Sequence, residues 1–385
     1  MKTYPLFKVH VDQEAALKEL AAVFESGYIN EGSQVTALTE ALQPILGSES
    51  LSLTNSCTSA LVLALRLSGV GPGDEVISTA MTCVATNAAI ASLGAKIVWA
   101  DVDPEHGMLD PASLEYQLTS HSRAKAVVAV AWAGTPPDLK ALGSVCREHG
   151  VRLILDAAHA FGAGYCRRPV HRWADFTCYS FQAIKHFTTG DGGALVCDSA
   201  RDHARGKALK WFGLDRDHAK DAQGNWKGQQ WDVDIEEIGY KFNMNNVAAA
   251  IGLSQLPHVS RILMKHRVNA ALYDELLGAD EMIRPVRRPA GAESAHWVYT
   301  VRLAPTPPTT SGRTRDELLR ALNAEGIMAG VVHVPNDDYT CFQRHRFRMP
   351  GLRDFAARQF SLPCGWWMEA DDIAHVARRV QELAR

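Results

Sequence analysis

Residues 180–193, Ser-Phe-Gln-Ala-Ile-Lys-His-Phe-Thr-Thr-Gly-Asp-Gly-Gly, combine side chains that could do chemistry. Lys185 lies five positions after Ser180 and shortly before the glycine-rich turn, and an upstream apolar run ends in Asp156. A loop lysine can form a Schiff base with an aldehyde, and an acid at a strand end can pair with a pyridine nitrogen. Alone, Lys185 could be a surface lysine and Asp156 a turn residue. Together they favour chemistry that depends on pyridoxal 5'-phosphate (PLP).

A second group of residues could hold the phosphate of such a cofactor. Residues 55–60 join a predicted strand to a predicted helix, whose N-terminal N–H groups would attract an anion. Thr58 and Ser59 add hydroxyls there, and Ser180 adds another, although the same residue types also serve as ordinary helix caps. His159, three positions after the strand-end acid, could contact the cofactor ring or be a core histidine.

Alternating strands and helices are predicted to position these residues. Repeated strand–helix units predict a mostly parallel sheet with helices on both faces, in which ligands bind beyond the carboxyl ends of the strands. Asp156 lies at such an end. The predicted strands are 51–53, 74–78, 96–100, 126–131, 151–155, 176–179 and 194–197, and the predicted helices are 59–67, 83–93 and 137–148.

The rest of the chain predicts a smaller α+β unit. Residues 201–238 are polar and are expected to form a surface excursion. We expect a large PLP-binding domain over residues 1–255 and a small C-terminal domain over residues 256–385. The predicted elements of this part are helices at 246–256, 261–277, 313–324 and 371–383 and strands at 296–303 and 327–334.

The composition narrows the class of protein. The chain has 385 residues, 46% of them hydrophobic, and a formal net charge of −3, which allows a large core and shows no block of charge for nucleic acid. The start resembles no signal peptide, and no apolar run is long enough to span a membrane. The eight cysteines form no C-x-x-C pair, which argues against a disulfide or metal framework. We therefore expect a cytoplasmic protein.

With these residues in view, the chain resembles the DegT/DnrJ-type sugar aminotransferases, PLP-dependent enzymes of fold type I. The resemblance covers nearly the whole chain. It implies that Lys185 is the Schiff-base lysine and Asp156 the pyridinium partner, with Thr58, Ser59 and Ser180 around the phosphate and His159 beside the ring. The similar segments are 5–7, 26–32, 71–77, 94–103, 156–159, 180–185, 190–193, 239–244 and 361–363.

The resemblance also implies a homodimer with shared active sites. Residues 239–244 would reach into the neighbouring site, where Lys241, in place of a frequent asparagine, would contact the cofactor phosphate by charge. Cys57 stands where relatives usually have glycine, and Cys83 stands where many have an aromatic residue on the ring face. Five further residues are candidates for substrate contacts, although each could equally be packing: Tyr28, Asn30, Trp297, His333 and Asn336.

The activity implied is transfer of an amino group from an amino acid, expected to be L-glutamate, to C4 or C3 of a nucleotide-linked ketodeoxysugar. Lys185 would also carry a proton between the reacting carbons. An acceptor such as a keto-cyclitol or a higher sugar acid, for example an octulosonate, stays open. So do dehydration and carbon–sulfur cleavage, although dehydrating relatives carry histidine at the lysine position. A PLP-binding regulator would need a DNA-binding module, for which no basic stripe is present.

Overall fold

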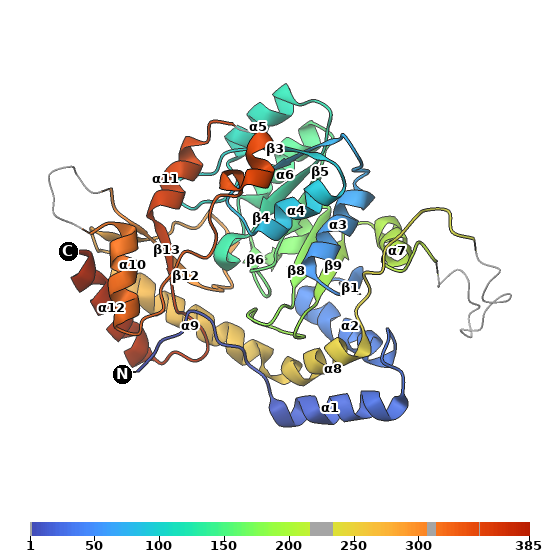
Figure 1. Ribbon diagram of the computed structural model, residues 1–385, viewed down its shortest axis with the longest axis horizontal. Coiled ribbons are helices and arrows are strands. Elements are labelled where there is room, and N and C mark those ends of the chain that lie inside the picture. Colours follow the sequence, from blue (N-terminus) through green and yellow to red (C-terminus); the bar gives the residue numbers. More distant parts are fainter. Residues whose placement is uncertain (1, 216–233, 306–312, 346) are drawn as a thin grey trace.

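The computed structural model describes residues 2–215, 234–305, 313–345 and 347–385 (Figure 1). A seven-stranded sheet with the order β1-β9-β8-β5-β4-β2-β3 lies at its centre. Neighbouring strands are parallel, except that β9 is antiparallel to both β1 and β8. The predicted mostly parallel sheet is therefore confirmed. Its strands are β1 (Leu51–Thr54), β2 (Glu75–Ser78), β3 (Lys96–Trp99), β4 (Ala124–Val130), β5 (Arg152–Asp156), β8 (Phe176–Ser180) and β9 (Gly193–Cys197).

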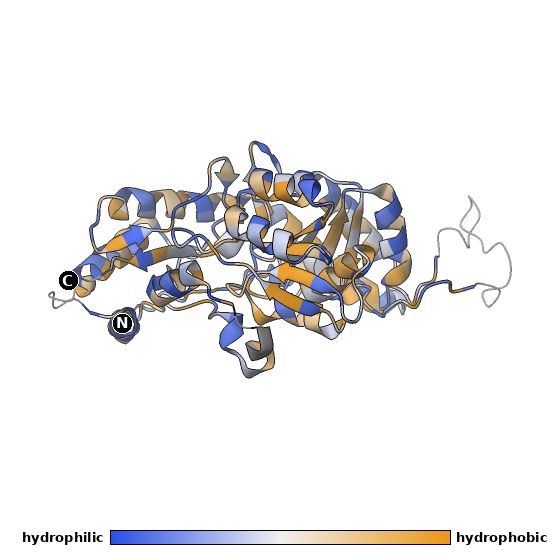
Figure 2. Ribbon diagram, turned by 90° about the horizontal axis from the view of Figure 1, so that it is seen from above, coloured by the Kyte–Doolittle hydropathy of each residue, from blue (hydrophilic) through white to orange (hydrophobic). Residues whose placement is uncertain are grey.

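Each face of this sheet carries its own hydrophobic core. Successive side chains of a strand point to opposite faces, so Val127 and Leu155 join the first core while Val128 and Ile154 join the second. Figure 2 shows the apolar strands enclosed between helices. The first core includes residues of α2 (Ser33–Leu46), α5 (Pro111–Ser120), α6 (Leu139–Glu148) and α8 (Asn246–Gln255). The second includes residues of α3 (Cys57–Leu67), α4 (Val84–Ser92) and α7 (Ala200–Leu209). Helix α1 (Gln13–Ser26) packs along α8.

The C-terminal part forms a third core around a small antiparallel sheet of order β10-β12-β13. Helix α9 (Val259–Leu277) joins two cores, because Leu263 belongs to the first and Tyr273 to the third. The division at residues 255 and 256 therefore stays a prediction. The elements of this part are β10 (Ile283–Pro285), β12 (Tyr299–Leu303), α10 (Arg315–Ala324), α11 (Pro350–Arg358), β13 (Gln359–Leu362) and α12 (Ala370–Ala384).

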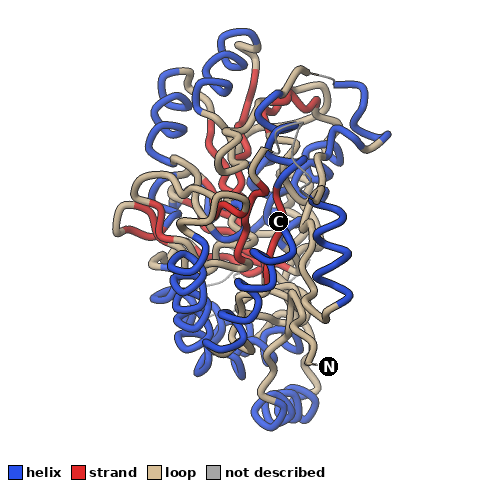
Figure 3. Tube along the Cα trace, turned by 90° about the vertical axis from the view of Figure 1, so that its left-hand side faces the viewer, coloured by secondary structure: helices blue, strands red, loops and turns tan. Residues whose placement is uncertain are grey.

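Short elements complete the chain, which Figure 3 shows from the side. A small sheet joins β6 (Gly164–Tyr165), β7 (Arg168–Pro169) and β11 (Ala292–Glu293). The 3₁₀ turns are η1 (Trp132–Gly134), η2 (Val170–Trp173), η3 (Leu256–His258), η4 (Asn336–Asp338) and η5 (Thr340–His345). Within the described ranges, no helix has both the length and the apolar character needed to cross a membrane.

Three sequence-based predictions need correction. The strand expected at 327–334 is wrong, because this segment forms only isolated bridges: Ile327 pairs with Tyr4 and Gly330 with Ser361, so no continuous ladder develops. The strand expected from His296 begins at Tyr299, since the φ of His296 is 50° and breaks the extended conformation. Residues 201–238 begin with α7, whose Leu209 packs in the second core. Residues 216–233 lie outside the described part.

Candidate active site

The carboxyl ends of β1, β5 and β8 meet at one edge of the sheet, together with the amino end of β9. Gly193 at the start of β9 pairs with Thr54 on one side and with Ser180 on the other. Asp156 at the end of β5 pairs with Cys178 of β8. Because of these pairings, the loops that leave this edge bring together residues that are more than a hundred positions apart in the sequence.

Asp156 is a buried carboxylate, with 4% of its surface exposed. Its Oδ2 accepts a hydrogen bond of 2.6 Å from Thr86 Oγ1, and its Oδ1 accepts one of 3.0 Å from the Ala158 N–H. Burial raises the pKa of Asp156 above its ordinary value, while these hydrogen bonds and the charge of Lys185 oppose the shift. A buried carboxylate in this environment is stabilised by a cationic partner.

Lys185 lies in the loop after β8, where its backbone N–H donates to Gln182 O at 3.0 Å. Its Nζ lies 3.7 Å from the centroid of the Trp297 ring. Burial lowers the pKa of Lys185 to about 8, against the opposing effects of Asp156, Cys57 and Cys83. A substantial fraction of the amine is therefore neutral near pH 8, which a nucleophilic lysine requires.

An aromatic wall stands beside Lys185. The rings of His159 and Trp297 stack with centroids 3.9 Å apart, and the His333 ring lies 5.4 Å from that of His159 and nearly parallel to it. His159 Nδ1 and His333 Nε2 are buried and have no hydrogen-bond partner among the described residues. Burial, with the neighbouring charge of Lys185, lowers both imidazole pKa values, that of His333 to about 4. The wall is therefore uncharged and offers two free ring nitrogens.

The segment expected to hold the phosphate begins helix α3. Ser56 is the N-cap, and its hydroxyl accepts the Ser59 N–H at 3.1 Å, while Ser59 Oγ donates to Asn55 Oδ1 at 2.6 Å. A Cβ on Gly193 would lie 2.5 Å from Cys57 N, so only glycine allows β9 to pass this close to the start of the helix. Thr58 lies in the first turn of the helix.

Two other predicted residues sit at the same edge. Ser180 is buried at the end of β8, and its Oγ accepts the Gln182 N–H at 3.3 Å. Cys83 is the half-buried N-cap of α4 and lies near enough to Lys185 to affect its pKa. Both are thus brought together with Asp156 and Lys185.

The remaining predicted residues have other surroundings. Asn336 is buried, and its side chain accepts from Asn87 Nδ2 and donates to Thr82 O, each at 2.8 Å, which ties η4 to α4. Tyr28 is 53% exposed. Asn243 donates to Asn30 Oδ1 at 3.3 Å and accepts from Lys241 Nζ at 2.6 Å. Within this chain, no contact between Tyr28, Asn30 or Lys241 and Lys185 is seen among the described residues, so their roles stay predictions.

Thr86 is a site residue that the sequence reasoning missed. It lies on α4 and bonds Asp156 directly, and its hydroxyl also lies 2.8 Å from that of Thr82. The available signal was the pair of threonines Thr82 and Thr86, four positions apart, of which Thr82 lies just before the N-cap of α4. That spacing does not reveal the carboxylate partner, which is 70 positions away in the sequence.

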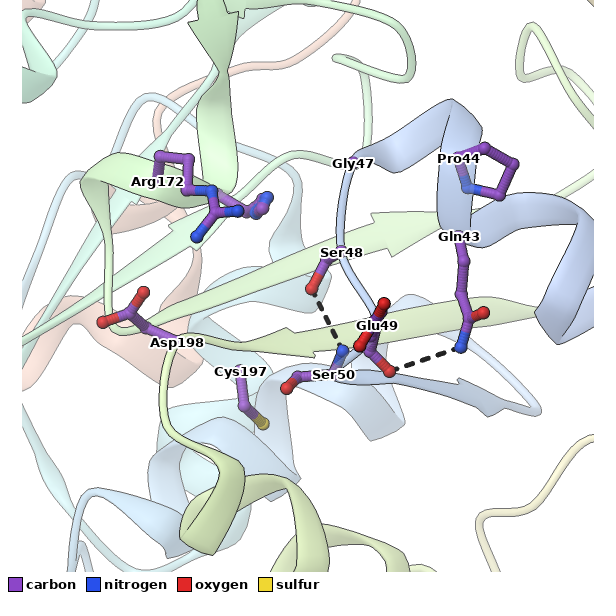
Figure 4. A pocket seen from close by; sticks show the side chains of 10 residues that line it. Gln43, Pro44, Gly47, Ser48, Glu49, Ser50, Arg172, Cys197 and Asp198 are labelled. Atoms are coloured by element: carbon purple, nitrogen blue, oxygen red, sulfur yellow. Dashed lines mark hydrogen bonds between the residues drawn. The ribbon is translucent and has the colours of Figure 1, made fainter.

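A pocket of about 550 Å³ lies at the opposite ends of β1 and β9 (Figure 4). Arg172, Glu49 and Asp198 give it charges of both signs, and it contains no lysine and none of the residues discussed above. The active site is therefore defined by its side-chain chemistry and lies apart from this pocket. The pocket is lined by Gln43, Pro44, Gly47, Ser48, Glu49, Ser50, His171, Arg172, Cys197 and Asp198.

A half-buried loop lysine near a strand-end carboxylate, on a mostly parallel sheet, is the arrangement that PLP-dependent transferases use. Residues 10–381 match the DegT/DnrJ/EryC1/StrS aminotransferase family, and the chain belongs to this family. A curated relative, the spore coat polysaccharide biosynthesis protein SpsC of Bacillus subtilis (strain 168), is 30% identical over 375 residues, which cover 96% of this chain and 94% of SpsC.

Solved structures of similar proteins match nearly the whole chain. AtS13 from Actinomadura melliaura is 36% identical, with a TM-score of 0.89 over 99% of both chains. The sugar aminotransferase CalS13 from Micromonospora echinospora is 32% identical, with a TM-score of 0.89 over 98% of this chain and 99% of its own. DesI, solved in the presence of its TDP-sugar product, is 29% identical, with a TM-score of 0.85 over 100% of this chain and 94% of its own. The protein is an aminotransferase with the fold type I architecture.

Proposed function

We propose that this aminotransferase binds PLP and transfers an amino group from L-glutamate to the C4 or C3 keto carbon of a nucleotide-linked deoxysugar. The observation that carries the proposal is the place of Lys185, half-buried in the loop after β8 at the sheet edge where Asp156 ends β5, with its pKa lowered to about 8. The similarity to CalS13, a sugar aminotransferase, and to DesI, which was solved with a TDP-sugar product, supports a sugar acceptor with a nucleotide carrier.

The residues of the site fit PLP in three respects. A protonated pyridine nitrogen would supply the cation that the buried Asp156 carboxylate favours. The start of α3, closely approached by Gly193, offers N–H groups and hydroxyls to a phosphate. Among the described residues, His159 Nδ1 is buried without a hydrogen-bond partner and suits the ring hydroxyl. When bound, PLP would supply the electron sink for removal of a proton from carbon.

Each side chain of the site then has a separate role in the proposed reaction. Lys185 Nζ accepts a proton from the reacting carbon and returns it to a neighbouring carbon, for which a pKa of about 8 is well matched. Asp156 stabilises positive charge on the ring nitrogen, and Thr86 and the Ala158 N–H orient its carboxylate. His159 and Trp297 pack as an uncharged wall that limits the access of water to Lys185.

We also propose that the working unit is a homodimer, in which Lys241 of each chain serves the phosphate of the other chain's site. Within one chain, the Lys241 ammonium is held by Asn243 Oδ1 at 2.6 Å and lies 3.9 Å from the centroid of the Trp211 ring. A positive charge held in this way can bind a phosphate of a neighbouring copy.

An acceptor screen tests the activity. The holoenzyme is treated with L-glutamate, the donor is removed, and ketosugars are added one at a time while absorbance follows the return of the original cofactor spectrum. We expect recovery only with nucleotide-linked 4-keto or 3-keto deoxysugars. Recovery only with free keto-cyclitols or sugar acids would replace the proposed acceptor. A spectrum that does not respond to glutamate would refute this donor, and dehydration would be tested next.

Thr86→Val provides a test of how Asp156 is oriented. Valine keeps the shape of threonine but removes the hydroxyl that donates to Asp156 Oδ2. Because a hydrogen bond to a charged group contributes about 1.5–3 kcal/mol, we expect PLP to bind roughly 10- to 100-fold more weakly. Equilibrium titration of the cofactor measures this change. Thr86→Ser, which keeps the hydroxyl, should bind PLP nearly as the unmodified protein does, and equal affinity in the valine variant would contradict the assignment.

A further inference from the structure

The Trp297 ring is the close partner of the Lys185 amine. Lys185 Nζ lies 3.7 Å from the ring centroid, well inside the range of about 6 Å over which a cation is attracted to an aromatic face. Trp297 is only 3% exposed, and removal of water strengthens this attraction. Among the described residues, Lys185 Nζ forms no hydrogen bond or ion pair, so the indole face is the contact that holds it.

Side-chain contacts fix the indole in this position. Trp297 Nε1 donates a hydrogen bond of 2.9 Å to Ile184 O, the residue directly before the lysine. Phe7 stacks on the indole with centroids 4.8 Å apart, and His159 stacks on it at 3.9 Å. The ring is thus joined to the N-terminal segment, to the loop after β5 and to the lysine loop itself.

The backbone around Trp297 is strained in a way that supports the same placement. The Trp297 N–H donates to Ala133 O at 2.9 Å, and the Ala295 N–H donates to Gly134 O at 2.9 Å. Ala133 and His296 have φ values of 53° and 50°, a left-handed conformation that is unfavourable for residues with a side chain. Such strain persists where the surrounding structure imposes it, and it is concentrated at functional sites.

We propose that Trp297 is a positioning residue for Lys185, whose indole face holds the lysine ammonium whenever that amine is not covalently engaged. The inference rests on the proposed function, because only a lysine that is released during the reaction needs a defined place to return to. Trp297 holds the protonated amine over its ring face, so the proton is delivered from a fixed position rather than from a mobile side chain.

Other groups also face Lys185 and must be considered in any pH dependence. Asp156 on β5, Cys57 on α3 and Cys83 at the start of α4 favour the ammonium, whereas burial, the largest effect, lowers the pKa to about 8. Three imidazoles also face the amine, and burial and the lysine charge keep their pKa values below the ordinary value: His159, His186 and His333. Trp297 differs from all of these groups because it attracts the cation without titrating.

Competitive acetylation tests the proposal without any reliance on turnover. The full-length protein is prepared without cofactor and labelled with trace acetic anhydride at a series of pH values, and mass spectrometry of the Lys185 peptide gives the labelling midpoint. We compare Trp297→Leu, which has no aromatic face, with Trp297→Phe, which keeps a smaller one. We expect the midpoint to fall by about one pH unit in the leucine variant and by less in the phenylalanine variant.

Controls separate this effect from a general disturbance. Lys8 Nζ lies 5.2 Å from the Trp366 ring in another part of the chain, so Trp366→Leu should leave the Lys185 midpoint unchanged. Unaltered labelling of Lys210, which is buried and whose Nζ donates to Glu31 Oε1 at 2.6 Å, shows that each variant is folded. An unchanged or raised Lys185 midpoint in Trp297→Leu would overturn the proposal. If the acceptor screen fails while the midpoint shifts as expected, the proposed substrate fails but the contact between lysine and indole stands.

Discussion

Lys185→Ala is expected to reduce transamination by roughly 10²- to 10⁴-fold or more, because the side chain supplies both the covalent anchor and the proton transfer. The protein should stay folded. Burial lowers the pKa of Lys185 from 10.5 to about 8, so the folded state binds the proton less tightly than the unfolded state does. Between these two pKa values, the unfolded state carries more protons than the folded state. The stability of the unmodified protein without cofactor therefore rises with pH in this range.

Kinetics and thermal unfolding together check this expectation. Steady-state rates with L-glutamate measure the loss of activity, and melting temperatures of the cofactor-free proteins from about pH 8 to pH 10.5 measure the linkage of the free amine. The alanine variant should be the more stable protein at pH 7, and its advantage should shrink as the pH rises through this window. Lys140→Ala on the exposed surface of α6 is the matched control. Turnover that stays within twofold in Lys185→Ala would remove the lysine from the mechanism.

Asp156→Asn is expected to lower turnover by about 10²- to 10³-fold, the range found when one preorganised electrostatic contact is removed. An asparagine oxygen can still accept from Thr86 Oγ1 or from the Ala158 N–H, so the local geometry is largely kept. The neutral amide cannot stabilise a positive charge on the ring nitrogen of the cofactor. The loss should therefore appear in the chemical step rather than in folding.

The effect of Asp156→Asn on stability should change sign when the cofactor binds. Burial raises the pKa of Asp156 above 3.8, so its favourable contribution is present below that pH and is lost as the pH rises through the folded-state pKa. At pH 7 without PLP, the asparagine variant should melt at or above the temperature of the unmodified protein. With PLP bound, the unmodified protein should gain more stability, because only the carboxylate pairs with the ring cation.

Asp198→Asn, in the pocket at the opposite ends of β1 and β9, is the control for loss of a carboxylate. It should change neither turnover nor the stabilisation by PLP. An Asp156→Asn variant that retains normal turnover, or that PLP stabilises as much as it stabilises the unmodified protein, would refute the assignment of Asp156 to the ring nitrogen.

The parts of the site that depend on local sequence were predictable, whereas the parts that depend on tertiary contacts were not. Asp156 follows an apolar run, and Lys185 precedes a glycine-rich turn, so both patterns are visible within a few residues. Thr86 acts on a carboxylate that lies 70 positions away, and a threonine in an alanine-rich helix has nothing unusual about it. Trp297 was expected within a strand, but the left-handed His296 delays the strand and directs Trp297 towards the lysine.

The fold, too, was predictable where it depends on local sequence and was not predictable where it depends on tertiary contacts. The strands of the large sheet alternate with helices and were predicted close to their observed positions. The error at 327–334 arose because that apolar segment makes single bridges to Tyr4 and Ser361. The strand that completes the small sheet is β13, which follows α11 directly with no turn residues between them to mark its start.

Five buried or half-buried imidazoles, three of them facing Lys185 and two farther away, determine what a pH–rate curve can report. Burial is the main cause that lowers the pKa of each: to about 4 for His266 and His333, to about 3 for His296, and well below the ordinary value for His159 and His186. All five are therefore neutral between about pH 7 and pH 8. Across that interval the charge of these histidines does not change. An inflection in the rate therefore reports the titration of the lysine, of the cofactor or of the amino group being transferred.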